Sequence, residues 1–147
     1  MQDELLKRAA TLMTEQIAAY GRLSSICSQL MVALARDVPE AIESVVRAGD
    51  AEMLRMRARL VELVNTLAAF ADARSAHPAP ISDEARAAFE KASAELLDAA
   101  RRFQRIRRRA ATLANNGSVF TAACMEMHGV RPITYSLPLT RGSTKWA

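Results

Sequence analysis

Residues 82–128 read SDEARAAFEKASAELLDAARRFQRIRRRAATLANNGSVFTAACMEMH. Two rows of mostly apolar side chains recur every seven residues through this segment, offset by three. The first row is Phe89, Leu96, Phe103, Ala110, Gly117 and Cys124, and the second is Ala85, Ala92, Ala99, Ile106, Leu113, Phe120 and Met127. This spacing is typical of a helix that packs along one seam against other helices, as in a coiled coil. An unbroken helix of this length would reach about 70 Å, so we expect an elongated protein.

The start of this helix is marked by its capping residues. Two prolines, Pro78 and Pro80, precede it and indicate a loop, because proline bars a helix from continuing. Ser82 is a suitable cap, and Asp83 and Glu84 follow in the first turn, where the helix dipole favours acidic side chains. We therefore expect the long helix over 82–128, and we expect it to continue through the turn-like triplet 115–117 because the apolar rows stay in phase there.

The first helix is predicted over about residues 4–36. Its apolar rows are Leu5, Ala9, Leu12, Gln16, Ala19, Leu23, Ile26, Leu30 and Ala33, flanked by Leu6, Met13, Tyr20, Cys27 and Leu34. So broad an apolar surface indicates two neighbouring helices rather than one. The phase fails at 37–40, where Asp37 and the early Pro39 resemble a fresh helix start, so we expect a break or a kinked extension over 38–47.

The second helix is predicted over about 50–74. Its seam is Ile42, Val46, Gly49, Met53, Met56, Leu60, Leu63, Leu67 and Phe70. Two interpretations of its beginning remain open. The unbroken phase favours one helix through Gly49, whereas a hairpin at Gly49 and Asp50 would match a long first arm to the long last helix. The hairpin is the interpretation that we favour from sequence.

Composition agrees with an all-α protein. Half of the 147 residues are apolar, and only 5 glycines, 5 prolines and 7 aromatic residues interrupt an alanine-rich chain. This length suits one domain. The expectation is an elongated antiparallel three-helix bundle or coiled coil over 1–128, with a long C-terminal helix. Residues 129–147, which contain Pro132 and Pro138, are expected to form an extended or flexible tail.

Cysteine usage and hydropathy favour a cytoplasmic protein. Cys27 and Cys124 fall at apolar helix positions, which suits reduced, buried thiols better than a secreted disulfide framework. The amino end, with Asp3 and Glu4, does not resemble a signal peptide, and no uninterrupted apolar run approaches 18 residues. We therefore expect no stable membrane insertion.

Six arginines between residues 101 and 109 form the most conspicuous charged cluster. They are Arg101, Arg102, Arg105, Arg107, Arg108 and Arg109. Placed on the heptad of Phe103 and Ile106, they occupy nearly every direction except the seam. A helix that binds along DNA would carry its basic residues on one side. A helix that binds single-stranded nucleic acid would also carry aromatic residues that stack on the bases, and this segment has no Tyr or Trp among its arginines. We interpret the cluster as a solvated helix surface, with Asp98 pairing Arg102 one turn away. The first alternative to a solvated surface is contact with an acidic protein or a membrane surface, and the second is binding of a nucleic acid. We expect no nucleic acid as a partner.

Residues with catalytic or metal-binding potential are sparse. Neither His77 nor His128 belongs to a set of Cys, Asp or Glu residues in the pattern of a metal site. Glu126 and His128 are one residue too close for the Glu-x-x-His pair of di-iron bundles. Neither cysteine is expected to act as a nucleophile, and no glycine-rich phosphate loop occurs. We expect no enzymatic activity, no cofactor and no metal.

A partner-binding site is predicted where the long helix can extend beyond its partner helices. An apolar stripe that no helix covers is a site for interaction. The alternating Ile133, Tyr135 and Leu137 of the tail can add to it. The candidate partner-binding residues are Leu113, Asn116, Val119, Phe120, Met125, Met127, Ile133, Tyr135 and Leu137.

The order of these features resembles the FlgN-type flagellar export chaperones. The similar features are a leading helix, the turn-like residues 43–50, a leucine-rich second helix over 53–67, and a long last helix. That helix carries Asn115-Asn116-Gly117 followed by Val119-Phe120, and in the tail Tyr135 precedes Arg141-Gly142-Ser143.

The resemblance implies a cytoplasmic chaperone. Such a protein binds the carboxy-terminal helices of hook-associated proteins, keeps them unassembled and delivers them to the flagellar type III export apparatus. The substrate-binding region of the family maps onto about residues 113–139. Two alternatives remain: a structural coiled-coil adaptor that self-associates permanently, and an arginine-rich helical protein that binds nucleic acid. The sequence leaves the oligomeric state open.

Overall fold

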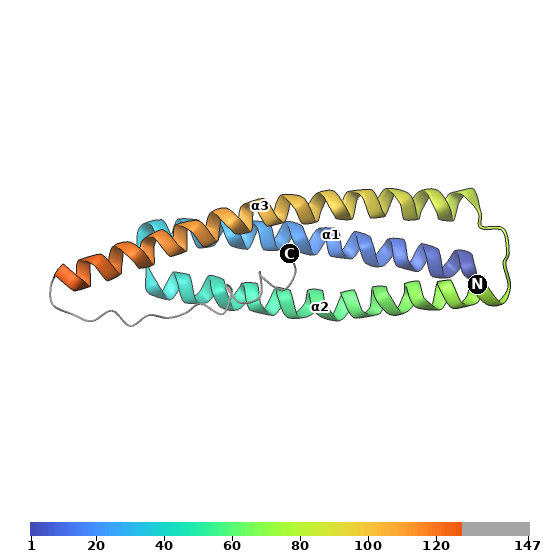
Figure 1. The fold of residues 1–147 in the computed structure, drawn as a ribbon, viewed down its shortest axis with the longest axis horizontal. Helices are drawn as coiled ribbons and strands as arrows, with labels where there is room; N and C mark the ends of the chain where they lie inside the picture. Colours follow the sequence, from blue (N-terminus) through green and yellow to red (C-terminus); the bar gives the residue numbers. More distant parts are fainter. Residues whose placement is uncertain (128–147) are drawn as a thin grey trace. The chain divides into compact units, whose positions relative to one another are not determined.

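The computed structural model describes the backbone of residues 1–127 and the side chains of residues 1–118. These residues form three helices, α1 Gln2–Arg36, α2 Pro39–Ala76 and α3 Asp83–Met127 (Figure 1). The prediction of an all-α fold with three long helices is confirmed. The chain divides into a first unit, Met1–Leu113, and a second unit that begins at Ala114. The packing described below is that of the first unit.

Helix α1 packs against both of the other helices and lies between them (Figure 1). It is antiparallel to α2, because the Gln16 side-chain amide donates to the Met56 carbonyl at 3.3 Å while Gln2, near its start, reaches the Ala73 carbonyl at 3.2 Å. It is parallel to α3, where the rings of Tyr20 and Phe103 lie 5.5 Å apart. Two neighbours were expected from the broad apolar surface of α1, and this prediction is confirmed.

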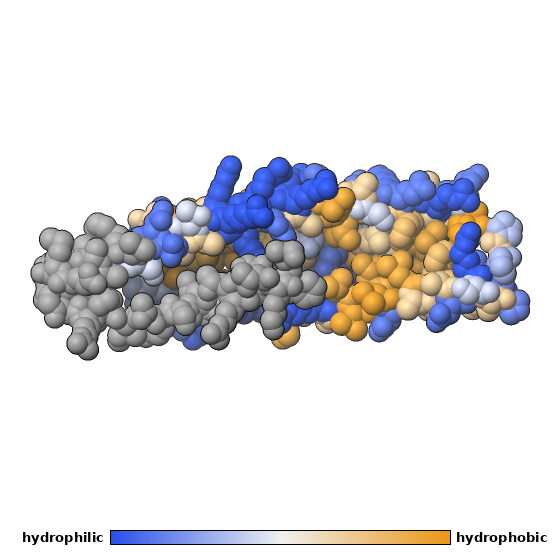
Figure 2. Space-filling view, in the orientation of Figure 1, coloured by the Kyte–Doolittle hydropathy of each residue, from blue (hydrophilic) through white to orange (hydrophobic). Residues whose placement is uncertain are grey.

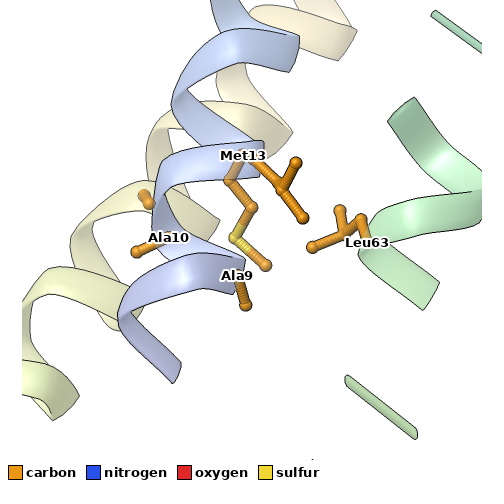
Figure 3. Packing of buried hydrophobic residues seen from close by; sticks show 6 residues of the cluster. Ala9, Ala10, Met13 and Leu63 are labelled. Carbon is orange, nitrogen blue, oxygen red and sulfur yellow. The ribbon is translucent and has the colours of Figure 1, made fainter. Parts of the chain in front are cut away.

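The buried side chains form two clusters along α1. The first consists of Ala9, Ala10, Leu12, Met13, Leu63 and Ala92, and the second of Ala19, Leu23, Met56 and Phe103. Each cluster draws on all three helices. In Figure 3, Ala10 lies on the side of α1 nearer to α3, while Leu63 of α2 faces α1 from the opposite side. Ala10 and Leu12 are two residues apart, so their side chains point in directions about 160° apart around the helix axis. One helix can therefore bury apolar residues against two partners.

The turn between α1 and α2 falls at Asp37, and the predicted hairpin at Gly49 and Asp50 is wrong. Asp37 adopts a left-handed conformation (φ 51°, ψ 50°), and its amide donates to the Leu34 carbonyl at 3.2 Å. Pro39 then occupies the first turn of α2, where its missing N–H costs nothing. This turn already gives arms of matching length, 35 and 38 residues. Gly49 is a helix-interior position, where an added Cβ would lie 3.5 Å from Cγ2 of Ile26 on α1.

The buried side of α2 is only partly the predicted one. Met56 and Leu63 are buried as expected, but Met53 and Leu60 of the predicted seam are 38% and 50% exposed. The neighbouring row, which includes Glu52 and Thr66, is buried against α1 in their place. The correction amounts to a rotation of α2 about its own axis, and its cause is an ion-pair cluster described below.

The start of α3 is the predicted one. The Ser82 hydroxyl accepts a hydrogen bond from the Ala85 amide at 3.2 Å, which confirms Ser82 as the cap. The Ser82 amide in turn donates to the Asp3 carboxylate at 3.1 Å. Hydrogen bonding from Ser82, mainly from its side chain and then from its backbone amide, holds the pKa of Asp3 below its usual range. The contact links the first turn of α1 to the start of α3. The helix continues through 115–117 as expected, whereas the predicted tail, 129–147, lies outside the described residues.

Helix α1 is also long and apolar enough, over an 18-residue window, to cross a membrane by length and composition alone. The central helix of a bundle has the same character, and α1 packs between α2 and α3 (Figure 1). The location of the protein in the cell therefore remains a prediction.

Candidate partner-binding site

The exposure of α3 changes along its second apolar row. Ala85 is fully buried and Ala92 is 5% exposed, whereas Leu113, further along the same row, is 38% exposed. Ala110, less than one turn before Leu113, is still only 4% exposed. Burial of α3 within the first unit therefore ends between these two residues. An apolar side chain at the end of a packed row, with the helix continuing past it, is the described part of the candidate site.

The remaining candidate residues are described to different extents. Asn116 is exposed and lies three residues after Leu113 on α3. Four others belong to α3, but their side chains lie outside the described residues: Val119, Phe120, Met125 and Met127. The last three, Ile133, Tyr135 and Leu137, lie wholly outside them. The assignment of these residues to one site stays a prediction.

The arginine cluster of α3 lies on exposed helix surface. All six side chains are exposed, and Figure 2 shows hydrophilic surface along the edge of the viewed face that α3 occupies. Arg102 pairs with Asp98, as predicted. No other arginine of the cluster has an ion pair with any carboxylate that the structure describes. The cluster is a basic surface without a built pocket.

Of the two cysteines, Cys27 is the one whose side chain the structure describes. Cys27 is free and half-buried beside the second core cluster. Burial raises the pKa of its thiol, although the nearby positive charge of Arg107 acts in the opposite direction. A thiol with a raised pKa is a poor nucleophile at neutral pH. The side chain of Cys124 lies outside the described residues.

Sequence reasoning missed a buried carboxylate with three arginines around it. Glu52 of α2 is 3% exposed. It accepts from Nε of Arg22 on α1 at 3.0 Å and from Arg55 at 3.1 Å, and Arg59 lies 3.9 Å away. The hydrogen bond from Arg22 is the main reason that the pKa of Glu52 lies below its usual range. Arg55 and Arg59 lie close to Glu52 in the sequence, but Arg22, which makes the main hydrogen bond, is 30 residues away and gives no local signal.

The Glu52 cluster holds α2 against α1. The arginine side chains reach solvent, with Arg22 and Arg55 49% and 63% exposed, so the carboxylate is buried while the positive charges remain hydrated. Bonds from two charged donors each stabilise the buried acceptor more than neutral donors do. Holding Glu52 against α1 turns the neighbouring Met53 toward solvent.

Replacing Glu52 by Gln is expected to lower the free energy of unfolding by about 2 kcal/mol at pH 7. The folded-state pKa of Glu52 is lowered, so its stabilisation is complete above its ordinary pKa of 4.5 and is lost as the pH falls through the lower folded-state value. The difference between parent and variant should therefore shrink in strong acid. Urea unfolding at pH 7 and near pH 3 measures it, and an undiminished difference at the lower pH would contradict the ion-pair account.

Metal binding finds no support in the part of the chain that is described. No group of three His, Cys, Asp or Glu side chains there could hold a metal ion.

Comparison with known proteins gives no relative. No protein-family model, no curated protein and no solved structure matches this chain.

Proposed function

We propose that this protein binds an amphipathic helix of another protein through the last part of α3 and performs no covalent chemistry. The single observation that supports this proposal is the change in exposure along α3, from a buried Ala92 to an exposed Leu113 on the same apolar row. The helix continues to Met127, and the same row continues in sequence with Phe120 and Met127. An exposed apolar side chain where a packed row ends suits the apolar side of an incoming helix.

The narrower proposal is an export chaperone of the FlgN type. In it, a cytoplasmic, elongated three-helix coiled-coil bundle with an extended tail binds the carboxy-terminal helices of hook-associated proteins and releases them at the flagellar export apparatus. Support comes from the sequence resemblance and from the three-helix bundle. Burying a handful of apolar side chains contributes several kcal/mol before the costs of association, which suits micromolar, reversible binding.

Identification of the partner comes first. A tagged full-length chain is used to capture proteins from the native cytoplasm, with Leu113→Asp and Leu97→Asp chains as a matched pair. Leu97 is 53% exposed on α3, so both changes place a carboxylate on an exposed leucine of the same helix. The proposal expects a specific helical partner on the parent and on Leu97→Asp, and its loss from Leu113→Asp.

Titration calorimetry of that partner then tests the site. Phe120→Asp and deletion of residues 129–147 are each expected to weaken binding at least about tenfold, which corresponds to about 1.4 kcal/mol. Thermal unfolding of both variants is expected to match the parent. If both variants bind as tightly as the parent, the binding site lies elsewhere, and if the deletion unfolds the bundle, the tail belongs to the core. Binding of an oligonucleotide that falls steeply with salt would support the nucleic-acid alternative instead.

A further inference from the structure

Helix α2 carries an exposed apolar row that its packing against α1 does not use. Its three most exposed large side chains are Leu54, Val61 and Val64, which are 69%, 59% and 55% exposed. With Asp50, Arg57, Ala68 and Ala71 they follow alternating steps of four and three residues, the spacing of a second helix-packing seam. All of these residues are exposed. We call this set the outer seam of α2.

The outer seam stands out from the rest of the described surface. Apart from Leu113 of the candidate partner site, the exposed large hydrophobic residues outside α2 are isolated on their elements, such as Val32 on α1 and Leu97 on α3. Single exposed residues of this kind need no explanation, whereas a continuous row indicates an interface. Figure 2 shows hydrophobic surface gathered over the second half of α2 and the neighbouring part of α1.

We propose that two copies of this chain associate reversibly through the outer seam of α2, with the two helices antiparallel. A two-fold interface places one surface against itself, so the surface must be self-complementary. An antiparallel pairing centred between residues 62 and 63 meets this condition. It sets Val61 opposite Val64 of the second copy, Leu54 opposite the second copy's Ala71, and Arg57 opposite its Ala68. The two valines meet at the centre, and each longer side chain on either side of them meets an alanine.

Charge complementarity supports the same register. Asp50 and Arg74 lie near opposite ends of the outer seam, and in this pairing Asp50 comes within one position of Arg74 of the second copy, twice per dimer. Both residues are exposed, and neither has an ion pair with another described residue. Moving the centre of the pairing by half a heptad toward Asp50 would set Arg57 of each copy opposite Val61 of the other, about one turn from the other copy's Arg57, and would lose both ion pairs.

The size of the seam predicts a weak dimer. From Asp50 to Arg74 the helix is about 37 Å long, and one helix face is about 10 Å wide, so each copy buries roughly 370 Å². A standard stable interface buries about 800 Å² per partner. The association is therefore reversible, unlike the permanent self-association of a structural adaptor. It uses no residue of the proposed partner site on α3.

Sedimentation equilibrium of the full chain tests this inference without any partner, so its outcome is independent of the proposed function. The average mass is expected to rise from the 16.1 kDa of one chain toward twice that value between about 5 μM and 1 mM. Val61→Glu brings two carboxylates close to the two-fold axis and should weaken the dimer at least about tenfold. The uncharged Leu54→Gln should also weaken the dimer, but less. Leu97→Glu, the matched control on α3, should leave the dimer unchanged.

A charge exchange tests the register. Asp50→Arg and Arg74→Asp should each weaken the dimer, and the double variant should restore it, because the ion pairs re-form with reversed signs. Circular dichroism checks that each variant stays helical. A mass that remains that of one chain at every concentration would overturn the inference. A dimer that Val61→Glu leaves intact would also overturn the inference. If the double variant does not regain the dimer affinity of the parent, the antiparallel register is wrong.

Discussion

Replacing Phe103 by Ala is expected to lower the free energy of unfolding by about 4 kcal/mol. Phe103 is 8% exposed and belongs to the core cluster in which α1, α2 and α3 all take part. Its ring also lies 5.5 Å from that of Tyr20, a tilted pairing that adds to the packing. Removing the ring leaves a cavity between three helices, and none of them can close it without separating from another.

Arg107→Ala is the matched control for Phe103→Ala. It lies one turn further along α3 and is exposed, so its replacement should change stability by less than about 0.5 kcal/mol. Urea unfolding of both variants measures the two effects. A larger loss for Arg107→Ala than for Phe103→Ala would show that α3 presents a different side to the bundle.

The second large effect is expected at Leu63. Leu63→Ala should cost about 3 kcal/mol, because this side chain is 5% exposed and packs in the first core cluster. Leu60→Ala, the same change on the neighbouring row of α2, should cost less than about 1 kcal/mol because Leu60 is 50% exposed. Sequence periodicity alone places both leucines in the seam. Equal losses in denaturant unfolding would therefore favour the sequence-based orientation of α2 over the observed one.

The helices could be predicted because their signals are local. Ser82 caps α3 through a bond to a residue three positions away, and the two apolar rows of α1 lie wholly within one helix. The turn at Asp37 also had a local signal in Pro39. The error at Gly49 came from treating glycine as a helix end when α1 packs close beside it.

The orientation of α2 could not be predicted from its apolar pattern. Met53 and Leu60 form a row as regular as that of Met56 and Leu63, and periodicity does not rank two neighbouring rows. The choice depends on Glu52, whose hydrogen bond comes from Arg22 on another helix. A charged residue one position from an apolar seam is ordinarily placed in solvent, and only its partners on the folded chain make its burial favourable.

The candidate partner site is known least. Leu113 and Asn116 have described side chains and are exposed, as a binding surface requires. The other candidate residues could be proposed only from the continuing heptad and from the resemblance, and their binding role stays a prediction.

Hydrogen exchange with and without the captured partner tests the central claim most directly, since it follows the folding core and the binding surface in one measurement. The account predicts that amides of residues 85–110 exchange slowly in the free protein and change little on binding. Amides from Leu113 to Met127 should gain protection when the partner is added. Protection gained only in α1 or α2, with residues 113–127 unchanged, would contradict the claim that the end of α3 binds the partner.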